Sequence, residues 1–149
     1  MKLADVINAW DTLEKVGKPE LSFSLYKGKE ERIDMITGLI EAMPSFNDKD
    51  NQVVSREIKK LINLLPKTYY NENNPNNGDY SFNTVTLKGD DTITLRSAEI
   101  VKGDNREHVQ NIKSLVNTIG RNMKADEYTV KVEYYGYNMQ EIIIRFWWD

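Results

Sequence analysis

The sequence predicts an α+β fold with the element order α-β-α-α-β-β-α-β-β and a mostly antiparallel sheet packed by helices on one side. Apolar residues recur at helical spacing in four segments and alternate with polar residues in five others. The last four predicted strands form two pairs, each joined by a short turn, which is typical of antiparallel hairpins. A chain of 149 residues with 40% hydrophobic content can build one core, so we expect a single domain over residues 1–149.

The first segment predicts an amphipathic helix followed by a strand. The apolar residues of the helix fall on one face: Leu3, Val6, Ile7, Trp10 and Leu13. Gly17 and Pro19 supply a stop signal, because glycine favours the helix end and proline cannot continue the helix. Leu21, Phe23 and Leu25 then alternate with polar residues, which predicts a half-buried strand.

Two further helices are predicted before residue 66. The second helix ends at Pro44 and has its apolar residues at Ile33, Ile36, Leu39, Ile40 and Met43. The third helix begins with Asp50 or Asn51 as N-cap and stops before Pro66. Its apolar residues are Val54, Ile58, Leu61, Ile62 and Leu65.

The segment 66–79 is rich in Asn, Pro and Gly and therefore predicts a loop. It is longer than most connections, which predicts either mobility or a role in contacts. We expect it to divide a helical half, residues 1–65, from a β-rich half, residues 80–149, of the same domain.

The β-rich half reads as a hairpin, a helix and a second hairpin. In the first hairpin the inward candidates are Val85, Leu87, Ile93 and Leu95, and the inward phase slips between Phe82 and Val85, which suggests a bulge. The helix is predicted over residues 105–124, with Asp104 or Asn105 as its cap. Its apolar face contains Val109, Ile112, Leu115, Val116, Ile119 and Met123. The second hairpin turns between Gly136 and Asn138.

Composition excludes several classes of protein. The chain has no cysteine, which rules out disulfides, thiol nucleophiles and cysteine-based metal sites. No apolar run approaches the roughly 20 residues of a membrane helix, and the first thirty residues lack a secretion signal, so we expect a cytoplasmic protein. Abundant Asn, Ile and Lys suit an AT-rich genome, such as that of a phage or another mobile element.

No set of residues predicts catalysis, a metal or a cofactor. The one histidine, His108, falls at the edge of an apolar helix face, where we expect a structural role. The triplet Gly89–Asp91 fits an ordinary hairpin turn. A metal-dependent nucleotide hydrolase is a second alternative function, because Glu30, Asp34 and Glu41 share a helix face. The next helix adds Glu57 alone, which favours a solvated acidic face.

The closing strand predicts a binding surface. One side of it presents Ile142, Ile144, Phe146 and Trp148, and the other presents Glu141, Ile143, Arg145 and Trp147. Tyr and Trp are favoured anchors at interfaces because they bury much area at little entropic cost. The predicted partner-binding residues are Trp147, Ile143, Arg145, Tyr135 and Tyr137. We therefore expect a small non-enzymatic protein of the inhibitor, immunity or anti-defence type that docks on a macromolecular partner, most naturally a protein.

Two other interaction modes remain open from the sequence. A single-stranded nucleic-acid binder is the alternative function, with C-terminal aromatic rings for stacking and a basic helix stripe for phosphates. That stripe consists of Arg106, Lys113, Arg121 and Lys124. Formation of a homo-oligomer through the C-terminal strand is a further expectation, because an uncovered strand edge pairs readily with a copy of itself.

Overall fold

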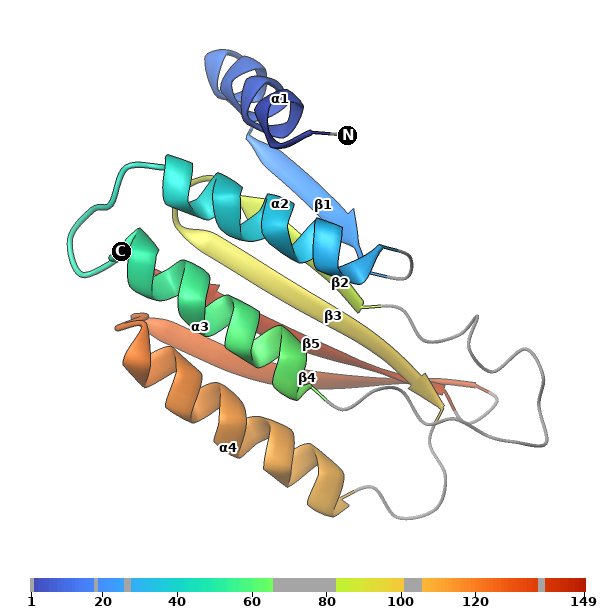
Figure 1. Ribbon diagram of the computed structural model, residues 1–149. Coiled ribbons are helices and arrows are strands. Elements are labelled where there is room, and N and C mark those ends of the chain that lie inside the picture. Colours follow the sequence, from blue (N-terminus) through green and yellow to red (C-terminus); the bar gives the residue numbers. More distant parts are fainter. Residues whose placement is uncertain (1, 18, 26–27, 66–82, 101–105, 137–138) are drawn as a thin grey trace.

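A computed structural model describes residues 2–17, 19–25, 28–65, 83–100, 106–136 and 139–149. These residues form four helices and a five-stranded sheet in the predicted order along the chain (Figure 1). The strand order in the sheet is β1-β2-β3-β5-β4, and every neighbouring pair is antiparallel. The predicted α+β class and the antiparallel sheet are therefore confirmed.

The bounds of the elements agree with the hydrophobic patterns of the sequence. The helices are α1 (Leu3–Lys15), α2 (Lys29–Ala42), α3 (Asn51–Leu64) and α4 (Arg106–Asn122). The strands are β1 (Glu20–Ser24), β2 (Asn83–Lys88), β3 (Thr92–Ile100), β4 (Glu127–Tyr135) and β5 (Met139–Trp147).

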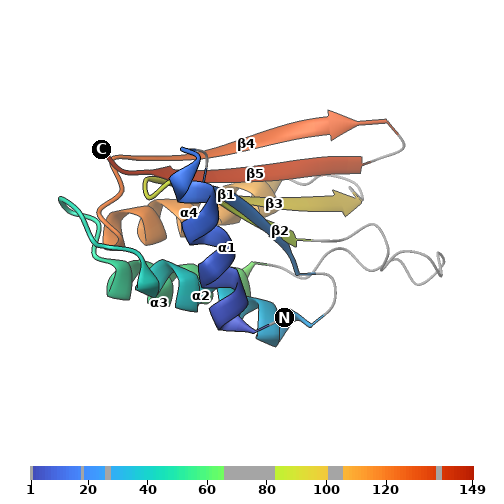
Figure 2. The same ribbon diagram turned by 90° about the horizontal axis from the view of Figure 1, so that it is seen from above.

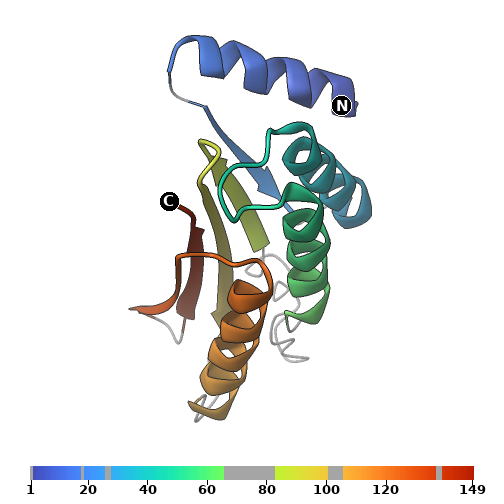
Figure 3. The ribbon, with the colours of Figure 1, turned by 90° about the vertical axis from the view of Figure 1, so that its left-hand side faces the viewer.

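The helices α2, α3 and α4 cover one face of the sheet, as the views along the sheet show (Figure 2, Figure 3). The first helix, α1, lies across the β1 end of the sheet and packs on α2. No described helix covers the opposite face of the sheet, which we call the open face. An antiparallel sheet tolerates this arrangement because alternate side chains can face the core and the solvent.

The core lies between the sheet and the three helices that cover it. The inward positions predicted for the β2–β3 hairpin are all buried: Val85, Leu87, Ile93 and Leu95. Every second residue near the end of the chain is buried as well: Ile142, Ile144, Phe146 and Trp148. The burial of β5 alternates strictly along its length, as the sequence pattern predicts. Helix residues complete the same core, including Trp10, Ile36, Ile58 and Val116.

Local signals at the helix ends are also confirmed. The carboxylate of Asp50 accepts a hydrogen bond from the Gln52 amide at 3.0 Å, so Asp50 is the N-cap of α3. Gly17 follows α1 with a φ of 77°, a left-handed conformation that favours glycine. The predicted cap at Asp104 or Asn105, the bulge beginning at Phe82 and the loop 66–79 lie outside the described residues.

The predicted end of the last helix is wrong. The sequence pattern predicts a helix that includes Lys124, but α4 ends at Asn122. Lys124 follows in a turn with a φ of 53°, and the Ala125 amide donates a 3.0 Å hydrogen bond to the Gly120 carbonyl. The chain must leave the helix here to enter β4, and the spacing of apolar residues alone does not record that change.

Candidate functional site

The open face is polar over most of its area and is built from alternate residues of all five strands. The strand register and the alternation of side chains determine which residues belong to this face. On β1, β2 and β3 they include Glu20, Ser22, Ser24, Thr84, Thr86, Lys88, Thr92, Thr94 and Arg96. On β5 and β4 they include Glu141, Ile143, Arg145, Trp147, Glu127, Thr129, Lys131 and Glu133.

The structure brings three of the five predicted partner-binding residues together on this face. Ile143, Arg145 and Trp147 are partly exposed, whereas their neighbours along β5 are buried. Ile143 lies in register between Arg96 and Lys131 on the adjacent strands. The open face therefore has two apolar residues, Ile143 and Trp147, which lie on either side of Arg145 along β5 among hydroxyl and charged groups.

Tyr135 and Tyr137, the other two predicted residues, cannot be assigned to the same surface. Tyr135 ends β4 in register with Met139, and its side chain lies outside the described part of the structure. Tyr137 itself lies outside the described residues.

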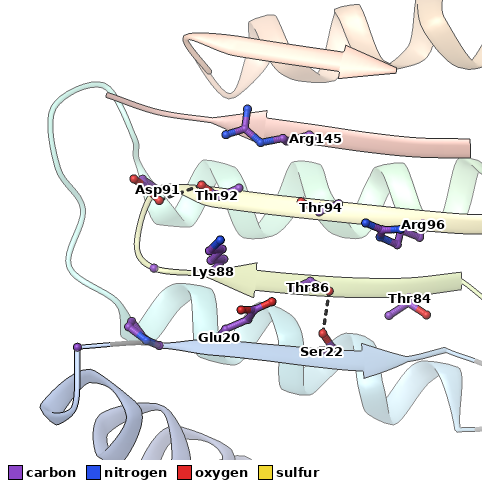
Figure 4. A pocket seen from close by; sticks show the side chains of 13 residues that line it. Glu20, Ser22, Thr84, Thr86, Lys88, Asp91, Thr92, Thr94, Arg96 and Arg145 are labelled. Atoms are coloured by element: carbon purple, nitrogen blue, oxygen red, sulfur yellow. Dashed lines mark hydrogen bonds between the residues drawn. The ribbon is translucent and has the colours of Figure 1, made fainter. Parts of the chain in front are cut away.

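A broad hollow lies on the β1–β3 half of the open face (Figure 4). Its volume is about 1060 Å³, and the chain after α1 borders it at Gly17 and Pro19. Three cations from adjacent strands, Lys88, Arg96 and Arg145, line it together with the carboxylates of Glu20 and Asp91. Between them stand the hydroxyl groups of Ser22, Thr84, Thr86, Thr92 and Thr94, and those of Ser22 and Thr86 lie 2.8 Å apart.

The two arginines of the hollow are held by ion pairs with residues of neighbouring strands. Arg96 Nη1 lies 3.0 Å from Glu141 Oε1, and Arg145 Nη1 lies 3.5 Å from Glu127 Oε2. All four side chains are partly exposed, and exposed ion pairs contribute little to stability. A partner can therefore replace either carboxylate at small cost.

The sequence analysis did not identify most of the hollow. Its threonines and Lys88 occupy the outward positions of β2 and β3, and only the inward positions of these strands were predicted from the sequence. The alternation of apolar and polar residues along β2 and β3 predicts that these side chains point outward. That they lie beside residues of β1 and β5 depends on the strand order.

The predicted basic stripe lies on the other side of the sheet. Arg106, Lys113 and Arg121 are exposed on α4, which packs on the covered face of β4. Trp147 faces the open side, and Lys124 is not on the helix. The stacking ring and the phosphate-binding stripe of the alternative function are therefore separated by the sheet.

The acidic residues of the second alternative function form no metal site. Glu30, Asp34 and Glu41 are exposed on α2, and Glu41 accepts a 2.6 Å hydrogen bond from the Ser55 hydroxyl. Glu57 is buried and lies 3.5 Å from the Asn122 amide nitrogen. Within the described ranges, no group of three His, Cys, Asp or Glu residues is arranged to hold a metal ion.

His108 is partly buried on α4, as expected at the edge of its apolar face. The turn Gly89–Asp91 joins β2 to β3, and Gly89 has a φ of 60°. The hairpin interpretation of this triplet is therefore confirmed.

The end of the molecule beside that turn contains a buried lysine that the sequence did not reveal. Lys49, in the α2–α3 connection, is 2% exposed, and its Nζ donates a 2.6 Å hydrogen bond to Asn51 Oδ1. The same Nζ lies 5.4 Å from the centre of the Trp148 ring and 5.7 Å from that of Phe46. Burial lowers the pKa of Lys49 to about 8, although the nearby carboxylates of Asp90 and Asp91 act to raise it.

The topology also corrects the expected route to a homo-oligomer. The C-terminal strand β5 lies between β3 and β4 and is paired along both edges. It therefore has no free edge for a second copy. Among the described strands, the free edges belong to β1 and β4.

Comparison of the chain with models of protein families, with curated proteins and with solved structures gives no match. No described helix combines the length and apolar character needed to cross a bilayer.

Proposed function

We propose that this protein is a non-enzymatic binding protein that docks on a partner protein through its open face. This proposal rests on one observation: two partly exposed apolar residues, Ile143 and Trp147, lie on a sheet face that no described helix covers. A docking role of this kind suits a small inhibitor, immunity or anti-defence protein of a phage or other mobile element.

The chemistry of the open face supports this role. Protein interfaces commonly combine a central aromatic or aliphatic anchor with a polar rim that hydrogen-bonds to the partner. Trp147 and Ile143 provide the anchor, and the threonines and arginines beside them provide donors and acceptors. The sheet fixes the backbone that carries these groups, so the conformational entropy lost on binding is confined to their side chains.

The test compares capture of a host protein by the wild type and by face-specific variants. Trp147→Ala and Ile143→Asp should each reduce capture of the same partner about tenfold or more, as loss of a central anchor does. Tyr134→Ala is the matched control, because Tyr134 is an aromatic residue of β4 that is 69% exposed on the other face. Equal loss of capture in all three variants, or in none, contradicts docking through the open face.

Nucleic acid is the competing partner, and salt distinguishes the two. A complex with single-stranded DNA should weaken steeply as salt rises, whereas an apolar protein contact should change little. We expect no quenching of tryptophan fluorescence by poly(dT) at low salt. Strong quenching that salt abolishes would instead assign the open face to nucleic acid.

A further inference from the structure

A second, smaller pocket lies at the end of the molecule where three segments of the chain converge. It has a volume of about 480 Å³, and we call it the tip pocket. The α2–α3 connection, the β2–β3 turn and the C-terminal residues form its lining: Pro44, Ser45, Phe46, Gly89, Asp90, Asp91, Trp147, Trp148 and Asp149. It is distinct from the hollow on the open face, although Gly89 and Asp91 border both.

The lining combines aromatic rings with negative charge. Phe46, Trp147 and Trp148 contribute rings, and Asp90, Asp91 and Asp149 contribute three side-chain carboxylates. Lys49 interacts with the carboxylates of Asp90 and Asp91, but it is buried and does not belong to the pocket lining. The lining therefore carries more negative than positive charge, which favours a cationic ligand.

Lys49 shows which groups at this end of the molecule face a cation, although its own burial disfavours the charged form. Its ammonium group lies close enough to the rings of Phe46 and Trp148 for a cation–π interaction with each. This ammonium group donates to Asn51 Oδ1. Asp90 Oδ1 is inaccessible to solvent and has no hydrogen-bond partner in the described structure. An unpaired buried carboxylate oxygen is costly, so the carboxylate of Asp90 is not fully satisfied by the donors around it.

We infer that the tip pocket binds the guanidinium or ammonium head of a basic ligand, held against the Trp147 ring by the carboxylates of Asp90 and Asp91. Guanidinium suits this pocket well, because it is planar, stacks on indole rings and donates to carboxylates in pairs. The cation is presented either by an arginine side chain of a partner or by a free alkylamine. This inference shares Trp147 with the proposed function, but it concerns a different pocket and can be tested without the partner.

The experiment titrates the full chain with small probes and follows the indole and amide signals by NMR. The probes are agmatine, the blocked peptide acetyl-Gly-Arg-Gly-amide and the same peptide with uncharged citrulline in place of arginine. We expect agmatine and the arginine peptide to shift the Trp147 indole signal with saturation. The citrulline peptide should bind about tenfold more weakly or not at all, because it has the shape of arginine without its charge.

Variants assign the binding to the tip pocket. The double variant Asp90→Asn, Asp91→Asn keeps the side-chain shapes and should weaken binding of agmatine about tenfold. Asp48→Asn is the matched control, because Asp48 is an exposed carboxylate of the α2–α3 connection that does not line the pocket. It should leave binding unchanged, and a thermal melt of each variant verifies the fold.

Each outcome is decisive for the inference. No saturable shift with either charged probe, or equal shifts with arginine and citrulline, overturns it. A response to agmatine alone supports a free small cation as the ligand, and a response to the arginine peptide as well supports a partner side chain. Failure here leaves the Ile143→Asp arm of the capture experiment unaffected, because Ile143 does not line the tip pocket.

Discussion

Adjacent tryptophans at the end of β5 have opposite environments. Trp148 is 1% exposed, and its indole Nε1 donates a 3.0 Å hydrogen bond to the Met123 carbonyl. Trp147 points to the open face and is partly exposed. The alternation of a strand separates the two rings, so one belongs to the core and the other to a surface.

This difference predicts different effects on stability. Trp148→Ala should lower the free energy of unfolding by about 3–5 kcal/mol, because it leaves a cavity and an unpaired carbonyl. Trp147→Ala should leave the melting temperature nearly unchanged. Urea denaturation of the two variants measures both values, and equal destabilisation would place Trp147 in the core.

Lys49 predicts a pH dependence of stability at the residue scale. Its pKa falls from 10.5 to about 8 in the folded protein because burial disfavours the charged form. Between these two values the unfolded chain binds a proton that the folded protein does not, so the free energy of unfolding rises with pH across this window. Below pH 8 both states are protonated, and the folded protein carries the full cost of the buried charge, up to about 3 kcal/mol.

The measurement compares the slope of stability against pH in two variants. Lys49→Met should remove the rise between pH 8 and 10.5, because the titrating group is gone. Lys59→Met changes an exposed lysine of α3 and should retain the rise. The slope is the informative quantity, since Lys49→Met also deprives Asn51 Oδ1 of its donor. An unchanged slope in Lys49→Met would show that its ammonium group is not the source.

At the scale of elements, the packing of α4 on β4 depends on a close approach at Gly120. A Cβ added at Gly120 would lie 2.5 Å from Tyr128 Cγ and 2.9 Å from Tyr128 Cβ. Tyr128 belongs to β4 and is partly buried, so its ring base cannot move without shifting the strand. The helix can therefore reach the sheet only with glycine at this position.

A matched pair of glycine substitutions tests this packing. Gly120→Ala should destabilise the protein by about 1–3 kcal/mol through overpacking, despite the better helix propensity of alanine. Gly38→Ala in α2 should be neutral or stabilising by up to about 1 kcal/mol. Its new Cβ would meet the end of the Leu3 side chain, which is flexible and 39% exposed. Thermal denaturation of both variants decides the matter, and equal losses would contradict a special role for Gly120.

At the scale of the whole molecule, one sheet and one core connect the helical half to the β-rich half. The strand β1 from the first half pairs with β2 from the second, and α3 packs against α4. The buried residues of both halves belong to a single hydrophobic cluster. The chain should therefore unfold as a unit.

Cooperative unfolding can be tested with core truncations in the helical half. Trp10→Ala in α1 and Ile36→Ala in α2 should each cost about 2–5 kcal/mol, because both side chains are buried. The near-ultraviolet and far-ultraviolet circular dichroism should report the same shifted transition. A separate early transition in Trp10→Ala would mean that α1 and its neighbours unfold independently.

The sequence by itself determined the elements, their order and the inward side of β1, β2, β3 and β5. Hydrophobic periodicity carries this information directly, as the burial of Val85, Leu95 and Ile144 illustrates. It also separated Trp147 from Trp148, because alternation along a strand is a local property. The N-cap role of Asp50 in α3 could be predicted for the same reason, because an N-cap side chain bonds to backbone amides only two or three residues away.

Only the tertiary structure decided which surfaces those residues share. The order β1-β2-β3-β5-β4 places the C-terminal strand inside the sheet and assembles the hollow from strands far apart in the chain. It also puts the basic residues of α4 on the side away from Trp147, and it buries Lys49 beside Trp148. Periodicity specifies the face of an element but not its neighbours, because pairing between distant segments depends on the packing of the whole core.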